Sequence, residues 1–120
     1  MRRDPAFLED MVLSADKIRD ICAGGDLGTL MANDVSQAAI LHHLAVIGEA
    51  ANQVSSDLRS RHPEIPWSRI VSQRNRVVHD YFGIDWTILW KTIREDLPRL
   101  RGHVSQILNT EFPPESNQEL

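Results

Sequence analysis

The residues best suited to acid–base and phosphate chemistry lie in one short segment of the chain. Arg74, Asn75, His79 and Tyr81 place a permanent cation, an amide, an imidazole and a phenol close together. Histidine exchanges protons near neutral pH, because its ordinary pKa is about 6.5. Arginine keeps its charge and presents a rigid fork of N–H donors to phosphate oxygens. These residue types suit metal-free cleavage of RNA. That reaction needs a base for the ribose 2′-hydroxyl, an acid for the departing 5′-oxygen and positive charge at the phosphate.

The spacing of Arg74 and His79 argues against a tight site on one helix. At about 100° per residue, their two side chains are separated by roughly 140° around a regular helix. Two copies of the chain meeting about an axis would therefore bring the groups together better than one copy. On chemistry alone a structural interpretation stays open, in which Arg74 forms a salt bridge and His79 ends a helix.

The chain is acidic, with a formal net charge of -4, so no general cationic field attracts nucleic acid. One segment departs from this balance, because between residues 58 and 79 the only acid is Glu64. The arginines of this segment are Arg59, Arg61, Arg69, Arg74 and Arg76. They form a candidate basic patch for a phosphate backbone, and a solvated helix surface is the alternative.

Other candidate sites are weaker. Cys22 is the only cysteine, which excludes an internal disulfide and a multi-cysteine metal site. His42 and His43 are adjacent, whereas two histidines that bind a metal from one helix lie three or four residues apart. We therefore expect no metal and no other cofactor. The tryptophans lie among apolar residues at helical spacing, which favours the core over base stacking: Trp67, Trp86 and Trp90.

Helical periodicity runs through the chain without a convincing strand, and predicts an all-α, up-down bundle of four to five helices. In the first helix, Asp4 is the expected cap, and Gly24-Gly25 is the expected end. The second is expected to begin at Asn33 or Asp34 and to end at His62-Pro63. Its apolar stripe alternates in steps of four and three: Ile40, Leu44, Ile47, Ala51, Val54 and Leu58.

The third predicted helix runs from Trp67 to His79 and is broken at residues 81–83. Asp85 then caps a fourth helix, in which Pro98 predicts a kink or restart near Asp96. We expect one domain over residues 1–109 and a disordered tail over residues 110–120.

The N-terminus lacks the apolar stretch of a signal peptide, because acidic residues interrupt it. No apolar run approaches the length of a membrane span. We therefore expect a cytoplasmic protein without membrane contact.

The segment from Arg74 to Tyr81 resembles the HepT-like toxins of the HEPN superfamily. Arg74, His79 and Tyr81 match the family pattern R-x4-H-x-Y, and Asn75 is the polar residue often found after that arginine. The resemblance covers nearly the whole globular part, through residues 47–51, 65–67, 80–85, 89–90 and 96–98.

This resemblance implies a HEPN bundle that forms a homodimer, with both motifs lining one cleft. It implies a metal-independent endoribonuclease that leaves a 2′,3′-cyclic phosphate. His79 would serve in acid–base work and Arg74 at the phosphate, with Asn75, Arg76 and Tyr81 in support.

The resemblance also implies a partner, since such toxins are usually paired with a minimal nucleotidyltransferase antitoxin in type VII toxin–antitoxin systems. The antitoxin can attach AMP to the motif tyrosine, here Tyr81. The added bulk and negative charge would repel RNA phosphate.

Two other functions stay open at this point. One is a helical scaffold that supports a nucleotidyltransferase and binds nucleotide without cutting RNA. The other is a plain dimerisation domain, for which the stripe from Ile40 to Leu58 would suffice. The combination of Arg74, His79 and Tyr81 favours the nuclease, because a scaffold has no need of these three residues.

Overall fold

A computed structural model describes residues 3–114 and builds them from helices joined by short loops. The long helices are α1 (Asp4–Cys22), α3 (Asp34–Gln53), α5 (Trp67–His79) and α7 (Leu97–Glu111). Helix α7 continues from α6 (Trp86–Lys91) through a π-helical turn, Thr92–Asp96. Two short helices, α2 (Leu27–Met31) and α4 (Ser56–Arg61), and a 3-10 turn, Tyr81–Gly83, complete the described residues. The all-α class is therefore confirmed.

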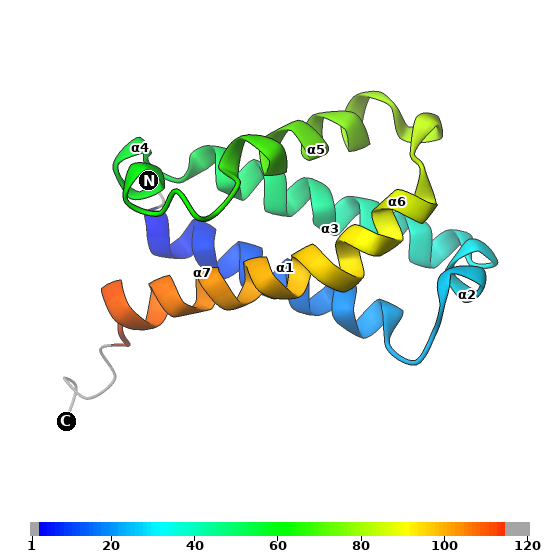
Figure 1. The fold of residues 1–120 in the computed structure, drawn as a ribbon, viewed down its shortest axis with the longest axis horizontal. Coiled ribbons are helices and arrows are strands. Elements are labelled where there is room, and N and C mark those ends of the chain that lie inside the picture. Colours follow the sequence, from blue (N-terminus) through cyan, green and yellow to red (C-terminus); the bar gives the residue numbers. More distant parts are fainter. Residues whose placement is uncertain (1–2, 115–120) are drawn as a thin grey trace.

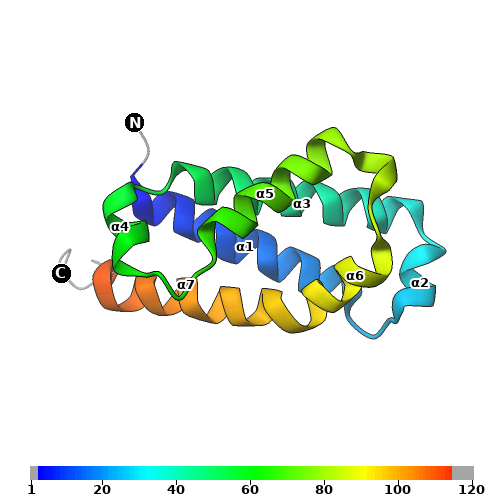
Figure 2. The same ribbon diagram turned by 45° about the horizontal axis from the view of Figure 1, so that its top comes forward.

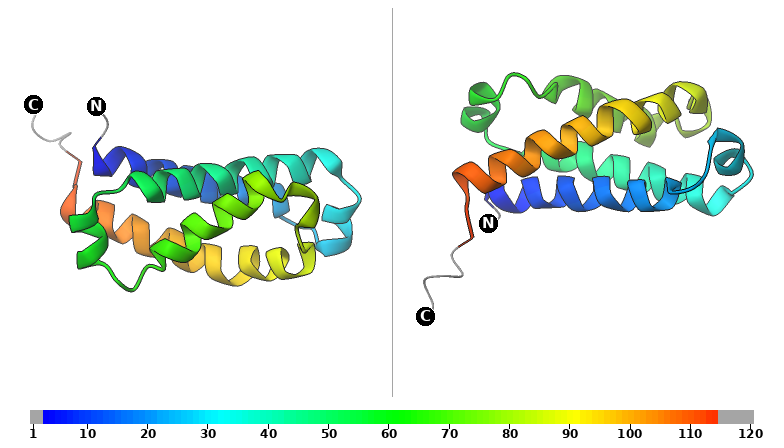
Figure 3. Two further views of the ribbon diagram at one scale, coloured as in Figure 1. Left: turned by 90° about the horizontal axis from the view of Figure 1, so that it is seen from above. Right: turned by 60° about the horizontal axis from the view of Figure 1, so that its bottom comes forward.

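Consecutive long helices run in opposite directions, so the bundle has the predicted up-down topology (Figure 1). Helix α3 packs against α1 and α5, while α7 packs against α1. Figure 2 shows α4 at the end where α1 begins and α7 ends, and α2 and α6 at the other end. Figure 3 shows α5 inclined to α3 and α7 inclined to α1. No helix in residues 3–114 has the length and apolar character to span a bilayer.

The core is built from one side of each long helix. Every member of the predicted second-helix stripe is buried, and Leu8, Met11 and Ile18 of α1 lie opposite it. Trp67 is also buried, and its indole N–H donates to the His62 carbonyl at 3.0 Å. The apolar stripe thus identified the buried side of the second predicted helix correctly.

The predicted cap of α1 is wrong, because Asp4 lies inside the first turn. Arg3 holds the N-cap position without a side-chain hydrogen bond to the helix. The Asp4 carboxylate instead accepts hydrogen bonds from the Ser55 backbone N–H at 2.9 Å and from its hydroxyl at 2.6 Å. Asp4 therefore ties the start of α1 to the start of α4.

The second predicted helix is two helices in the structure. Helix α3 ends at Gln53, and the Ser55 hydroxyl accepts the Leu58 N–H at 3.2 Å to begin α4. The break leaves the apolar stripe buried on both sides, so periodicity alone could not reveal it. Asn33 is confirmed as a cap, since its side chain accepts the Ser36 N–H at 3.0 Å.

The interruption predicted near Asp96 is a turn of π-helix. The Leu97 N–H bonds to the Thr92 carbonyl, one residue further back than in an α-helix. Pro98 has no N–H and its ring crowds the preceding turn, which a wider turn relieves. Helix α7 then continues past residue 109, the predicted domain boundary, to Glu111. Residues 115–120 of the predicted tail lie outside the described residues.

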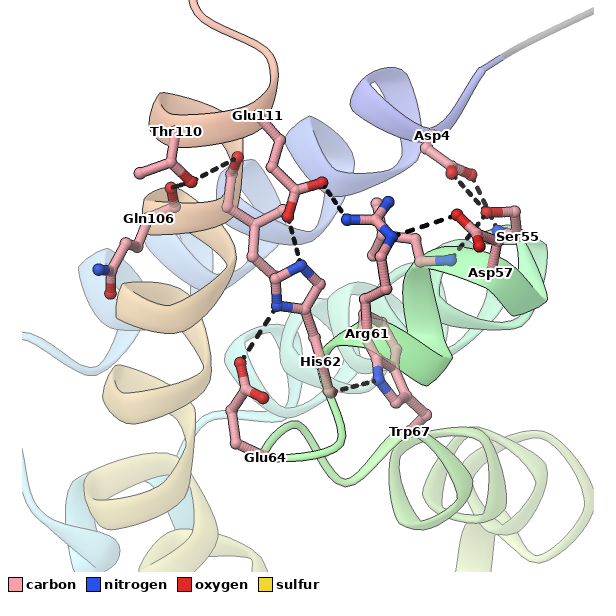
Figure 4. A network of polar contacts seen from close by, with 12 residues as sticks. Asp4, Ser55, Asp57, Arg61, His62, Glu64, Trp67, Gln106, Thr110 and Glu111 are labelled. Atoms are coloured by element: carbon pink, nitrogen blue, oxygen red, sulfur yellow. Dashed lines mark hydrogen bonds and ion pairs between the residues drawn. The ribbon is translucent and has the colours of Figure 1, made fainter.

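Polar side chains fasten the end of α7 to the loop after α4 (Figure 4). Arg61 Nη1 donates to Glu111 Oε1 at 2.6 Å, and His62 Nε2 contacts Glu111 Oε2 at 2.5 Å. The other ring nitrogen of His62 contacts Glu64 at 3.3 Å. The hydrogen bond from Arg61, and then that from His62, lowers the pKa of the Glu111 carboxyl. This network, Arg61–His62–Glu64–Glu111, fastens the end of the bundle where α1 begins and α7 ends.

Candidate active site

Helix α5 carries the predicted motif and has the bounds predicted from the sequence. Its inner side buries only Trp67 and Val77, which leaves most of its surface exposed. The helix ends when the Asp80 N–H bonds to the Arg76 carbonyl at 2.8 Å. His79 is therefore the last helical residue, and its side chain is exposed.

Arg74 lies on the side of α5 that packs against α3. Its Nη2 is 2.9 Å from Glu49 Oε2, and its Nη1 donates to Asn75 Oδ1 at 2.8 Å. A Cβ atom on Gly48 would overlap Arg74 Cβ, so the two helices come this close only because residue 48 is glycine. Helix α3 thus sets the position of Arg74 through one glycine and one carboxylate.

His79 occupies another side of the same helix. At about 100° per residue, Arg69, Arg76 and His79 fall on one side of α5, and Arg74 is roughly 140° from His79. All three of these side chains are exposed, and none of them forms an ion pair within residues 3–114. The structure brings Arg74 together with Asn75 and keeps His79 apart from them.

Tyr81 and Phe82 form an exposed aromatic turn immediately after His79. Their rings meet edge to face, with centroids 5.3 Å apart, and Phe82 is 98% exposed. The Gly83 N–H donates to the Asp80 carbonyl at 3.0 Å, and a Cβ on Gly83 would overlap the Asp80 carboxylate. A side chain at residue 83 would therefore require the exposed Asp80 carboxylate to move, and the turn presents Tyr81 to solvent.

The predicted basic patch is not a single patch. Arg61 lies on α4 at the opposite end of the molecule and binds Asp57 and Glu111. Arg74 is engaged by Glu49. On its side of α5, the positive charge near His79 therefore comes from Arg76, and Arg69 lies about 15 Å from His79 along the helix axis.

No role for Glu49 follows from the sequence pattern alone, although Glu49 lies in a segment that carries the family resemblance. A glycine inside a helix disfavours that helix, so Gly48 was a signal of close packing at this position. Phe82 was predicted only as part of a helix break, because its exposure depends on how the turn leaves the bundle.

The other candidates have structural surroundings. His43 Nδ1 lies 3.2 Å from the Ser14 hydroxyl, and its ring meets His42 edge to face. Burial lowers the pKa of His43. Within the described part of the chain, no three His, Cys, Asp or Glu side chains are grouped as a metal site requires.

Comparisons with known proteins match most of the chain, including the segment that carries the motif. The family model described as "Ribonuclease HepT-like" matches residues 11–107. The chain is 35% identical over 99 residues to "Putative RNase MJ1380" of Methanocaldococcus jannaschii, covering 82% of this chain and 91% of that protein. It is 33% identical over 101 residues to "Probable ribonuclease HepT" of Thermococcus cleftensis, covering 84% and 92%. No solved structure matches the chain significantly.

Proposed function

The chain belongs to the HepT-like ribonuclease family, and on this premise we propose that it is an RNA-cleaving toxin. The observation that carries the proposal is the exposed His79 at the end of α5, with Arg69 and Arg76, which form no ion pair within residues 3–114, on its side of the helix. An exposed imidazole with cations beside it is suited to act on a phosphodiester that arrives from solvent.

The proposed reaction needs no metal. One histidine accepts the proton of the ribose 2′-hydroxyl, whose oxygen attacks the phosphorus. The bond from phosphorus to the 5′-oxygen breaks, and a second histidine returns a proton to that oxygen. Arg74 stabilises the charge that builds on the phosphate, with Asn75 holding its guanidinium and Arg76 adding positive charge. The product is a 2′,3′-cyclic phosphate.

Each chain carries one motif histidine, His79, so a mechanism that uses two of them needs two chains, and the proposed active unit is a homodimer. Arg74 and His79 lie on different sides of α5, and a second copy would supply the group that each side lacks. Exposed apolar side chains around the motif support this: Val78 at 50%, Phe82 at 98% and Ile88 at 66% exposure. Exposed apolar patches of this kind mark interaction surfaces.

Tyr81 is the proposed site of control. Its side chain is 46% exposed, which leaves the hydroxyl open to a cytoplasmic nucleotidyltransferase antitoxin. Transfer of AMP from ATP to that hydroxyl, with release of pyrophosphate, would put an anion beside the RNA site. Incubation with the cognate nucleotidyltransferase and ATP should add AMP mass to the parent and not to Tyr81→Phe.

The test of the activity is cleavage of labelled RNA by purified protein in EDTA. The parent and His42→Ala, a control at another exposed histidine, should cut, and His79→Ala should not. Cleavage by His79→Ala equal to that of the parent would show that His79 is not the catalytic histidine. Activity lost in EDTA and restored by magnesium would contradict the metal-free mechanism. A parent that binds the nucleotidyltransferase but cuts no RNA would favour the scaffold alternative.

A further inference from the structure

A cavity of about 340 Å³ lies between the end of α1 and the π-helical turn that leads into α7. The site of RNA chemistry proposed above is on α5, and none of the residues that line this cavity belongs to α5. Its volume falls within the range of about 300–1,000 Å³ typical of small-molecule sites. π-Helical turns inside α-helices occur frequently at functional sites.

The walls of the cavity are largely apolar. Ala15 and Cys22 contribute from α1, and Ile93 and Leu97 from the opposite helix, with Pro98 beside them. Burial raises the pKa of the Cys22 thiol, so the side chain stays neutral and extends the apolar wall. An apolar body would therefore find contact on both sides of the cavity.

Among the described residues, one of the cations that line the cavity has no ion-pair partner. Arg101 binds Asp16 with two donors, at 3.0 and 3.3 Å, and Arg19 binds both Asp16 and Asp20. The guanidinium of Arg94 lies 5.6 Å from the centre of the Trp90 ring, and it forms no ion pair within residues 3–114. The cavity is thus lined by three arginines and one carboxylate, Asp16, and Arg94 is the arginine that no carboxylate in the described part of the chain engages.

We infer that this cavity binds a small organic anion, whose apolar body lies between Ala15 and Leu97 and whose charged group meets Arg94. An anion can pair with the Arg94 guanidinium without displacing a carboxylate, because no carboxylate within residues 3–114 binds it. The apolar walls add contact area that a bare inorganic ion cannot use. The inference is independent of the proposed ribonuclease activity.

The test uses naphthalene-1-sulfonate as the anion and naphthalene-1-sulfonamide as its neutral counterpart. Amide NMR of the full chain should show shifts for the sulfonate at residues 15–24 and 93–101. Arg94→Gln should raise its Kd about tenfold or more, the loss expected for one charge-assisted hydrogen bond. Arg99→Gln makes the same charge change outside the cavity and should alter the Kd less than about twofold. Ala23→Trp, at an exposed position of the rim, should block binding by filling space.

Several outcomes would overturn the inference. Amide shifts confined to residues outside the cavity, or no binding of the sulfonate at all, would show that the cavity is not an anion site. Equal binding by Arg94→Gln and the parent would remove the role of the arginine. Sulfonamide binding as tightly as sulfonate would contradict an anion site, and inorganic phosphate binding as tightly would contradict the apolar contribution. RNA cleavage, measured in parallel, should be the same in Arg94→Gln and Arg99→Gln.

Discussion

Arg74 is the most firmly held side chain of the motif, and the carboxylate that holds it comes from another helix. Glu49 lies 2.9 Å from the Arg74 guanidinium, while the exposed His79 has no hydrogen-bond partner within residues 3–114. Salt bridges of this exposure contribute little to stability, with a median near 0–1 kcal/mol. We therefore assign Glu49 the role of positioning Arg74 rather than of stabilising the fold.

Glu49→Gln should lower kcat for RNA cleavage by roughly tenfold, because an arginine held less firmly meets the phosphate in fewer productive orientations. The free energy of unfolding should change by less than about 1 kcal/mol. Cleavage kinetics and urea unfolding check the two effects separately. Glu95→Gln removes an exposed carboxylate elsewhere and is the control. A Glu49→Gln enzyme with unchanged kcat would show that Arg74 needs no help from α3.

At the scale of helices, the approach of α5 to α3 depends on one residue without a side chain. Gly48 is buried against Arg74, and its missing Cβ sets the distance between the two helices. At the other end of the bundle, Glu111 of α7 is held by the loop after α4. These contacts make two predictions about stability.

Gly48→Ala should destabilise the protein by about 1–3 kcal/mol, the usual cost of overpacking. Gly102 of α7 provides the matched control, because a Cβ there meets open space. Gly102→Ala should be neutral or stabilising by up to about 1 kcal/mol, since alanine favours a helix. Urea unfolding of both variants measures the difference. Similar stability changes in the two would contradict the tight contact between α3 and α5.

The Arg61–His62–Glu64–Glu111 network should make the free energy of unfolding depend on pH in the acidic range. The pKa values of Glu111 and Glu64 are lowered from 4.5 in the folded protein. A carboxyl whose pKa is lower in the folded than in the unfolded protein stabilises the fold at pH values above its unfolded pKa. This stabilisation is lost as the pH falls through the folded pKa. Unfolding free energies should therefore fall below about pH 4.5, and Glu111→Gln should reduce that fall.

The measurement is urea unfolding at pH 7 and at steps below pH 4.5. Glu9→Gln, at an exposed position of α1, is the control and should keep the full acid dependence of the parent. A Glu111→Gln protein with the same dependence as the parent would show that this carboxyl does not contribute to it.

At the scale of the whole molecule, the motif and its exposed aromatic turn lie at one end of the bundle and the polar network lies at the other. The proposed dimer would join two motif ends, because that is where exposed apolar side chains surround His79. In a symmetric dimer, residues near the axis face their own copies. Arg74 of one chain would then lie closer to the histidine of its partner.

Mixing Arg74→Ala and His79→Ala subunits tests this assembly. Each variant alone should be inactive, whereas the mixed dimer keeps one arginine and one histidine on opposite chains. Partial recovery of RNA cleavage is expected, because the remaining His79 can still accept the 2′-hydroxyl proton while water supplies the proton to the 5′-oxygen, and native mass spectrometry verifies the mixed dimers. Recovery would be absent if each site used both residues of one chain or needed both histidines, and a monomer that cleaves RNA would exclude the shared cleft.

The sequence by itself determined the features that depend on neighbouring residues. The bounds of α5 and the caps at Asn33 and Asp85 rest on hydrogen bonds that reach only a few residues along the chain. The R-x4-H-x-Y spacing likewise predicts the angle between Arg74 and His79 around α5, because a regular helix has a fixed rotation per residue. Helical periodicity identified the buried side for the same reason.

Only the tertiary structure decided which distant groups meet. Ser55 interrupts the second helix with the help of Asp4, which is 51 positions away, and no local pattern announces that pair. The partner of Arg74 is fixed by how closely α5 packs on α3, and the cavity beside Arg94 by how α7 passes α1. These contacts depend on the packing of whole helices, since the arrangement that buries the core also selects the polar groups that come within reach of one another.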